Sequence, residues 1–264
     1  MSSKPSDSPK SNSRRGDTFV DAFAKGLTII RTFNQSKEKM TLSEVAERAE
    51  LPAATTRRLL YTLVNLGYAR QSNKRFELSP KILDLGYSYL TSLPFHDIAH
   101  ALLDDFARNV KEVCSVSMLE GNDVVYVVRT EVRTPLARNI GVGGRLPAHA
   151  TSSGLILLAA LPADAIDAYL QQAPFEAHTS KTRVTADAIR EAITFIHENG
   201  WMRSSEELEL GVCGLAVPIQ NLRGETAAAL GVSINLARYN EEEILQTFLP
   251  KLREIAAQIG PRCD

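Results

Sequence analysis

Residues 41–79, TLSEVAERAELPAATTRRLLYTLVNLGYARQSNKRFELS, decide the fold of the N-terminal part of this chain. The run opens on Thr41-Leu-Ser-Glu44, a capping box of the kind that begins a helix. Apolar side chains then recur at i, i+3, i+4 and i+7, which predicts one buried stripe. These side chains are Leu42, Val45, Ala46 and Ala49. Pro52 suits the first turn of a second helix, and Gly67 suits the position just past its end.

The second helix is predicted to have two faces of different character. Leu59, Leu63 and Leu66 recur at i, i+4 and i+7, so they are predicted to be buried. The opposite face carries Ala54, Arg57, Arg58, Tyr61 and Asn65. Thr55 and Thr56 lie in the first turn, where hydroxyls and free amides can hold a phosphate. Small, basic and aromatic side chains suit a helix in a major groove, where an arginine can pair with a guanine edge.

A basic hairpin is predicted to follow. Residues 68–70 and 76–78 have the composition of strands, and the polar residues between them form a turn. Its tip carries Lys74 and Arg75, which are expected to contact DNA phosphates. Two helices, a tight turn and a basic hairpin, in this order, are typical of a winged helix-turn-helix that binds duplex DNA. The alternative that the pattern leaves open is a solvated basic surface on a small helical subdomain.

Charge is distributed unevenly along a chain whose net charge is only −1. Residues 1–92 contain 15 Lys and Arg against 9 Asp and Glu, whereas residues 93–264 contain 15 against 22. This asymmetry predicts a DNA-binding head on an acidic body. The boundaries that we predict are 1–17 for a disordered basic tail, 18–79 for the winged helix-turn-helix, 80–95 for a linker helix and 96–264 for an effector-binding domain.

Composition argues against several other classes of protein. No apolar run approaches the roughly 20 residues of a membrane span, and the polar N-terminus lacks the apolar core of a signal peptide. The three cysteines, Cys114, Cys213 and Cys263, are far apart and form no CxxC pair. We therefore expect a cytoplasmic protein without a membrane partner, a metal site or a cofactor.

The predicted linker helix begins after Ser79-Pro80 and is unusually apolar for a solvated spacer. Its stripe consists of Ile82, Leu83, Gly86, Tyr89 and Leu90. An exposed apolar stripe on such a helix is often a contact between subunits, and DNA readers of this kind usually bind two half-sites. The sequence therefore predicts a homodimer or a dimer of dimers on a palindromic or repeated operator.

The remainder of the chain is predicted to be an α+β domain with a mixed sheet. Strands are expected at 114–119, 124–128, 212–219 and 226–234, with another beginning at 200, a loop at 141–147, and helices at 96–112, 151–161, 163–172, 185–198 and 241–259.

Over residues 18–260 the chain resembles the IclR family of bacterial transcription regulators. Besides the helix-turn-helix, the stretches that carry the resemblance are Gly144–Gly154, Gly200–Glu207 and Gly211–Ile219. Residues 76–90 and 138–141 look most like regulators of protocatechuate and 4-hydroxybenzoate catabolism. The resemblance implies a winged helix-turn-helix, a linker helix and a C-terminal GAF-like effector-binding domain, assembled as dimers or tetramers.

The resemblance also implies an effector site. Its residues would be Ser152, Ser153, Ser204, Gly214, Gly231 and Ser233. The sequence departs from the family pattern at Ser204, where Asp is frequent, at Gly214, where Cys is common, and at Leu155, where Lys is frequent. A serine can donate a hydrogen bond to a carboxylate that an aspartate would repel. The two glycines are expected to leave room for a ring.

These features predict that the effector is a small carboxylic acid, and the resemblance favours an aromatic one. Ser152 and Ser153 would offer hydroxyls and amides at a helix N-terminus, which attracts anions; simple helix capping is the alternative. Arg138, placed on a predicted strand before the glycine-rich loop, would supply positive charge. A surface role is the alternative for Arg138. A regulator of another carboxylate pathway remains open.

An enzyme and a redox sensor are the two alternative classes of function. An enzyme would need a nucleophile and a base in reach of each other, and the sequence offers no such arrangement. Glu206 and Glu207 are adjacent, so on a strand they would point to opposite faces, and His149 is interpreted as a structural histidine. A redox sensor would use Cys114 and Cys213, although a buried strand thiol is usually inert.

Overall fold

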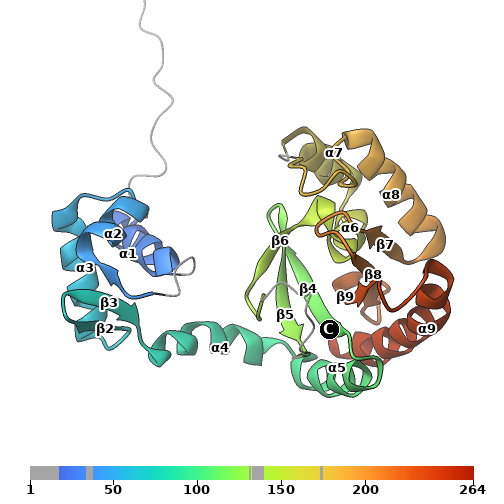
Figure 1. Ribbon diagram of the computed structural model, residues 1–264, viewed down its shortest axis with the longest axis horizontal. Coiled ribbons are helices and arrows are strands. Elements are labelled where there is room, and N and C mark those ends of the chain that lie inside the picture. Colours follow the sequence, from blue (N-terminus) through green and yellow to red (C-terminus); the bar gives the residue numbers. More distant parts are fainter. Residues whose placement is uncertain (1–17, 34–37, 131, 133–139, 173–174) are drawn as a thin grey trace, which may run out of the picture. The chain divides into compact units, whose positions relative to one another are not determined.

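The computed structural model describes residues 18–33, 38–130, 132, 140–172 and 175–264 (Figure 1). The chain divides into two compact units, residues 1–88 and residues 89–264. Within the described ranges, no helix has the length and apolar character that a membrane crossing requires.

The described residues up to Leu78 form the helices α1, α2 and α3 and a small antiparallel sheet. The elements are α1 (Asp21–Thr32), β1 (Met40–Thr41), α2 (Leu42–Arg48), α3 (Ala53–Asn65), β2 (Ala69–Ser72) and β3 (Arg75–Leu78), with strand order β1-β3-β2. The capping box is confirmed: Thr41 Oγ1 accepts from the amide of Glu44, whose carboxylate accepts from the amide of Thr41. Val45, Ala46 and Ala49 are buried, as predicted. Helix α1 was not among the elements predicted.

The buried face of α3 differs from the prediction. Thr56, Leu60 and Leu63 are buried, whereas Leu66 is 56% exposed and Leu59 is only partly covered. The buried stripe is therefore displaced by three positions along the helix, which corresponds to a rotation of roughly 60° around the helix axis. The prediction was based on the spacing of Leu59, Leu63 and Leu66, whereas the core of this unit includes Thr56 from the first turn of α3. The predicted opposite face is exposed, and its residues are Ala54, Arg57, Arg58, Tyr61 and Asn65.

The hairpin after α3 is longer in its strands and tighter in its turn than predicted. The two turn residues are Asn73 and Lys74, both with positive φ, which is the backbone of a two-residue hairpin turn. Arg75 is consequently the first residue of β3 and does not lie at the tip. Gly67 has φ +81°, as expected for a residue just past a helix end.

The predicted linker helix consists of a short 3-10 turn (Pro80–Ile82) followed by α4 (Leu83–Ser92). None of the residues of α4 is buried. Leu83 and Tyr89 of the predicted stripe are 70% and 49% exposed, while Ile82 and Leu90 are partly covered. In a single copy of the chain, α4 therefore exposes apolar side chains to solvent.

The second unit is built on a six-stranded sheet in the order β6-β5-β4-β9-β8-β7. The strands are β4 (Val113–Glu120), β5 (Asp123–Arg129), β6 (Arg145–Pro147), β7 (Met202–Ser205), β8 (Val212–Gln220) and β9 (Thr226–Asn235). Every pairing is antiparallel, so the prediction of a mixed sheet is wrong. Residues 145–147 form strand β6, although the sequence predicted a loop there.

Helices cover both faces of this sheet (Figure 1). α5 (His96–Val110) and α9 (Glu241–Ile259) pack on one face, and α6 (Ser152–Ala159), α7 (Ala163–Gln172) and α8 (Ala186–Asn199) lie on the other. The strands alternate between these cores, as β8 illustrates: Cys213 and Leu215 face α5 and α9, while Ala216 faces α6. The bounds of α7 and α9 agree with the prediction, and the α+β class is confirmed.

Candidate functional site

A cavity of about 80 Å³ lies between the start of α6 and the sheet. By volume it holds several water molecules or a small ligand. Its lining includes every predicted effector residue within the described ranges: Ser152, Ser153, Ser204, Gly214, Gly231 and Ser233. These residues come from α6, β7, β8 and β9. Arg138, the remaining candidate, lies outside the described residues.

The N-terminus of α6 opens directly on this cavity. Thr151 is the N-cap, since its hydroxyl accepts from the amide of Gly154 at 3.1 Å. Ser152 and Ser153 therefore do not cap the helix. Within the described residues their amides have no backbone acceptor, as expected in a first helical turn. All eight residues of α6 are buried, so this helix end is enclosed in the domain and anion-attracting.

The two cavity glycines serve a different purpose from the one predicted. A Cβ added to Gly214 would lie 2.8 Å from Ser152 Oγ, and a Cβ added to Gly231 would lie 2.6 Å from Ser153 Oγ. Both distances are shorter than real carbon–oxygen contacts. The absence of a side chain at Gly214 and Gly231 therefore leaves space for the hydroxyls of Ser152 and Ser153, which pack directly on the sheet. The expectation that they accommodate a ligand ring is not supported.

Ser204 provides a buried hydrogen-bonding group at the β7 end of the cavity. Its side chain is 5% exposed, and its hydroxyl has no hydrogen-bond partner among the described residues. Burial raises the pKa of the nearby Glu207 carboxyl group, and the Ser204 hydroxyl is the smallest of the contributions that oppose this rise. A buried polar group without a partner is costly, and a ligand that accepts its hydrogen bond would remove that cost.

Arg129, at the end of β5, is a cavity residue that the sequence interpretation missed. Its guanidinium lies over the ring of Tyr126, with 4.6 Å between its central carbon and the ring centroid. One terminal nitrogen is buried and has no hydrogen-bond partner within the described part of the chain. Burial raises the pKa of Tyr126, and the adjacent Arg129 opposes that shift. The cavity therefore contains one buried guanidinium nitrogen without an acceptor in the described part of the chain.

The sheet register separates Arg129 from the helix terminus. Arg129 pairs with Ser115 on β4, and Ser115 pairs with Gly231 on β9, beneath Ser153. Two strand spacings correspond to about 10 Å. A bound acid would thus meet a guanidinium on one side and the amides and hydroxyls of α6 on the other, and both of these groups attract an anion.

The acidic pair beside the cavity does not form a catalytic dyad. Glu206 forms an ion pair with Lys181, and Glu207 forms an ion pair with Arg183. His149 is buried and bonded to the carbonyl of Glu176 at 3.0 Å, and burial lowers its pKa, so it is neutral at pH 7 and structural. Among the described residues, no cluster of three or more His, Cys, Asp or Glu side chains could hold a metal ion.

The two sheet cysteines have the properties of structural thiols. Cys114 and Cys213 are fully buried in the core between the sheet and the helices α5 and α9. Burial raises the pKa of Cys213 to about 12 and that of Cys114 further. Since the thiolate is the reactive form, neither thiol is suited to redox sensing in this fold.

A second candidate surface lies in the first unit, in a groove between α3 and the hairpin. It is lined by Ala53, Ala54, Arg57, Arg58, Tyr61, Gln71 and Lys74, above Leu42 and Phe76. The Arg57 guanidinium lies 5.8 Å from the Tyr61 ring, and Tyr61 packs edge-on against Phe76. Of the residues predicted to contact DNA, this groove brings together Arg57, Arg58, Tyr61 and Lys74, all of them exposed.

Two residues that were predicted to contact DNA, Thr56 and Arg75, do not have side chains available for it. Thr56 is fully buried and its amide is bonded to the carbonyl of Pro52, so neither group can reach a phosphate. Arg75 donates to the carbonyl of Lys39 at 2.7 Å and lies 3.6 Å from Glu44. Its guanidinium is thus occupied within the domain, in contrast to Lys74 at the tip. Thr55 is half-buried and borders α1.

The architecture defines a class: a winged helix-turn-helix joined to a domain with a small-molecule cavity is a ligand-responsive DNA-binding regulator. The model of the IclR helix-turn-helix domain matches residues 22–73, and that of the bacterial transcriptional regulator IclR C-terminal domain matches residues 87–260. The chain belongs to the IclR family of transcription regulators.

Individual relatives are consistent with this assignment. The Pca regulon regulatory protein of Pseudomonas putida is 37% identical over 89% of this chain and 81% of its own length. The Pca operon regulatory protein of Acinetobacter baylyi is 34% identical over 93% and 90%. An IclR homologue from Microbacterium hydrocarbonoxydans, solved in complex with 4-hydroxybenzoate, superposes with a TM-score of 0.81 at 25% identity, covering 92% of this chain and 99% of that one.

Proposed function

We propose that this protein is a cytoplasmic transcription factor whose operator binding is switched by an aromatic carboxylic acid of the protocatechuate or 4-hydroxybenzoate type. The observation that carries the proposal is the cavity itself, which presents a buried Arg129 nitrogen and a Ser204 hydroxyl that have no partner among the described residues, together with the amides of Ser152 and Ser153 at the start of α6. The relatives named for the Pca genes and the 4-hydroxybenzoate complex support the same ligand class.

A thermal-shift screen against aromatic and aliphatic carboxylates tests this proposal. A ligand that binds only the folded state raises the melting temperature, by an amount that grows with concentration above its Kd. We expect an aromatic acid to raise the melting temperature and to change the affinity for the operator. A screen in which no carboxylate stabilises the protein would refute the ligand class, and thiol alkylation that abolishes operator binding would favour redox sensing instead.

The DNA interface gives a prediction about single side chains. Arg57→Ala and Arg58→Ala are each expected to weaken specific operator binding by roughly 1–3 kcal/mol if the arginine pairs with a base. Lys74→Ala should weaken binding to all sequences alike and reduce its salt dependence, because hairpin tips contact phosphates. Arg75→Ala should have less effect on the salt dependence, since its guanidinium is bonded within the domain.

Fluorescence anisotropy with an operator selected from random DNA measures these effects at two or more salt concentrations. Arg108→Ala is the matched control, because Arg108 is an exposed arginine of α5 in the other unit. Affinities for specific DNA that are unchanged by Arg57→Ala, Arg58→Ala and Lys74→Ala would contradict the assigned surface.

We further propose that the protein is at least a dimer. Leu83, Leu85, Tyr87 and Tyr89 of α4 are each about half exposed or more, a larger apolar surface than a solvated helix normally carries. Sedimentation at micromolar concentration is expected to show a dimer or tetramer, and Leu83→Glu with Leu85→Glu should shift it toward monomer. A wild-type monomer that protects a single half-site would contradict this proposal.

A further inference from the structure

The turn between β7 and β8, residues 206–211, forms part of the cavity wall. Leu208 and Glu209 of this turn line the cavity, next to Val212 at the start of β8. Ser204 ends the same wall on the other side. The position of the turn therefore determines the width of the cavity at this end.

The backbone of this turn is held in a conformation that few side chains adopt alone. Glu206 has φ +58°, in the left-handed region that non-glycine residues rarely occupy. Such conformations persist where surrounding contacts determine them. Here the Glu206 carboxylate accepts from the amide of Gly211 at 2.9 Å, and the Glu206 amide donates to Val212 at 2.8 Å.

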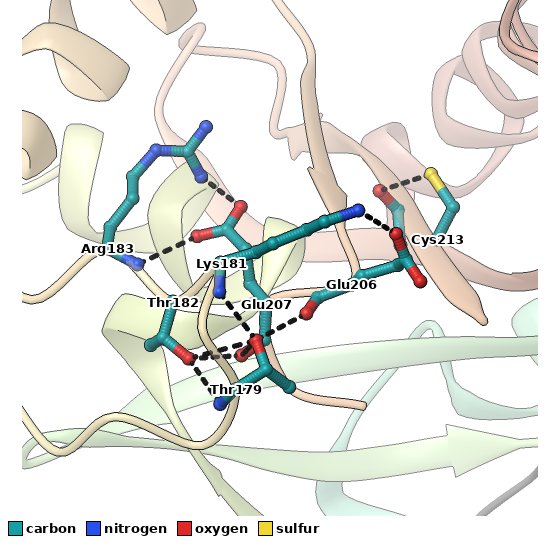
Figure 2. Close-up of polar contacts among 8 residues, drawn as sticks. Thr179, Lys181, Thr182, Arg183, Glu206, Glu207 and Cys213 are labelled. Carbon is teal, nitrogen blue, oxygen red and sulfur yellow. Dashed lines mark hydrogen bonds and ion pairs between the residues drawn. The ribbon is translucent and has the colours of Figure 1, made fainter. Parts of the chain in front are cut away.

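Residues 179–183, which we name the brace, hold the turn from outside (Figure 2). The Thr179 hydroxyl donates to the carbonyl of Glu206 at 2.7 Å, and the Thr182 hydroxyl donates to the carbonyl of Glu207 at 2.6 Å. Thr182 Oγ1 also accepts from the amides of His178 and Thr179, at 3.0 and 2.9 Å. The carbonyls of Glu206 and Glu207 are thus held by two hydroxyls, and these hydroxyls accept in turn from the amides of residues 178, 179 and 181.

Two ion pairs reinforce these contacts. The Glu207 side chain is only 4% exposed, and its carboxylate meets the Arg183 guanidinium and the Arg183 amide. Lys181 meets Glu206 at the exposed side of the turn. Figure 2 shows the brace side chains converging on the two glutamates. Because α8 and β7 separate the brace from the turn in sequence, these long-range contacts supplement those made by neighbouring residues.

We propose that the brace positions the 206–211 turn and thereby sets the affinity of the cavity for its effector, with Thr182 and Arg183 as positioning residues. This inference rests on the proposed function, since it assumes that the cavity binds an acid. The brace touches the main chain of the turn, while Leu208 and Glu209 of the same turn face the cavity. Loosening the brace should therefore weaken ligand binding without removing any ligand contact.

Thr182→Val tests the proposal, because valine keeps the shape of threonine and removes the hydroxyl. We expect amide exchange in residues 206–211 to accelerate at least tenfold and binding of 4-hydroxybenzoate, measured by calorimetry, to weaken about tenfold. Thr182→Ser, which keeps the hydroxyl, should restore both. Thr194→Val is the matched control, since the Thr194 hydroxyl donates to a carbonyl on the exposed side of α8.

Several results would overturn the proposal. The brace would have no role in effector binding if Thr182→Val bound 4-hydroxybenzoate with wild-type affinity. The same conclusion would follow if Thr194→Val lost as much affinity as Thr182→Val, or if Thr182→Ser did not restore the affinity. Thr179→Val provides a second variant should Thr182→Val not fold. A wild type that binds no acid would refute the proposed function alone, and unchanged amide exchange in Thr182→Val would then refute the brace independently.

Discussion

Replacing Arg129 by glutamine is expected to weaken binding of 4-hydroxybenzoate by about 10- to 100-fold. The Arg129 guanidinium lines the cavity and has a buried nitrogen without a partner in the described part of the chain. A hydrogen bond from a charged donor contributes roughly 1.5–3 kcal/mol, and each 1.4 kcal/mol changes Kd about tenfold. Operator binding without effector should be unchanged. Calorimetric titration of both proteins measures the difference.

Two further arginines make this experiment specific. Arg145→Gln is the matched control, since Arg145 lies on the neighbouring strand β6 and is bonded to Asp123 and Glu120 at the surface. It should bind the acid like the wild type. Arg138→Gln tests the residue chosen from the sequence. Equal affinities in wild type and Arg129→Gln would remove Arg129 from the site, and a loss confined to Arg138→Gln would restore the first interpretation.

Replacing Arg238 by alanine is expected to destabilise the second unit by roughly 3 kcal/mol, the lower end of the range for a broken buried pair. Glu112 is almost completely buried and lies 2.8 Å from the Arg238 guanidinium, which also donates to the carbonyls of Lys111 and Val110. Removing the arginine leaves a buried carboxylate without its counter-ion. Since Arg238 is partly exposed, solvent reduces the cost. The melting temperature should fall by about 6–12 °C.

The pH dependence of this loss follows from the Glu112 carboxyl group. Burial raises its pKa above the ordinary value of 4.5, and Arg238 opposes that shift. Without Arg238 the folded state holds the proton more tightly than the unfolded state. Stability is therefore lost as the pH rises from the unfolded toward the folded pKa. The difference in melting temperature between wild type and variant should be small near pH 4 and largest at neutral pH.

Two variants check this explanation. Adding Glu112→Gln to Arg238→Ala should recover most of the loss, because no buried charge remains. Arg190→Ala breaks an exposed ion pair with Asp167 and should cost at most about 1 kcal/mol. A loss in Arg238→Ala that is equal at all pH values, or that Glu112→Gln does not relieve, would mean that packing rather than charge is responsible.

The fold was largely predictable because its signals are local. The capping box at Thr41, the hairpin at the Glu120–Asp123 turn and the amphipathic pattern of α9 each depend on residues close in sequence. The phase of α3 was not predictable in this way. Thr56 is fully buried, and α3 packs against α1, α2 and β2, so the packing of these elements, rather than the leucine pattern, determined which face of α3 is buried.

The candidate site shows the same limit. Its serines and glycines were found through the family resemblance, but Arg129 was not. Strict alternation along β5 places Val124, Tyr126 and Val128 on one face, with Arg129 on the other. A bulge opposite Val116 and Ser117 shifts this phase, so Val128 joins the α5 side and Arg129 returns to the cavity face with Tyr126. An extra residue in a ladder leaves no mark in the composition of a strand.

The central claim is that the cavity beneath α6 binds a carboxylic acid through its charge. The measurement that tests it most directly is a calorimetric titration of the full-length protein with 4-hydroxybenzoate and, in parallel, with its methyl ester. The two ligands share a ring and a hydroxyl and differ in the negative charge that Arg129 and the α6 amides would bind. We expect saturable binding of the acid and, for the ester, affinity at least tenfold weaker. Equal affinity for acid and ester, or binding of neither, would contradict the account.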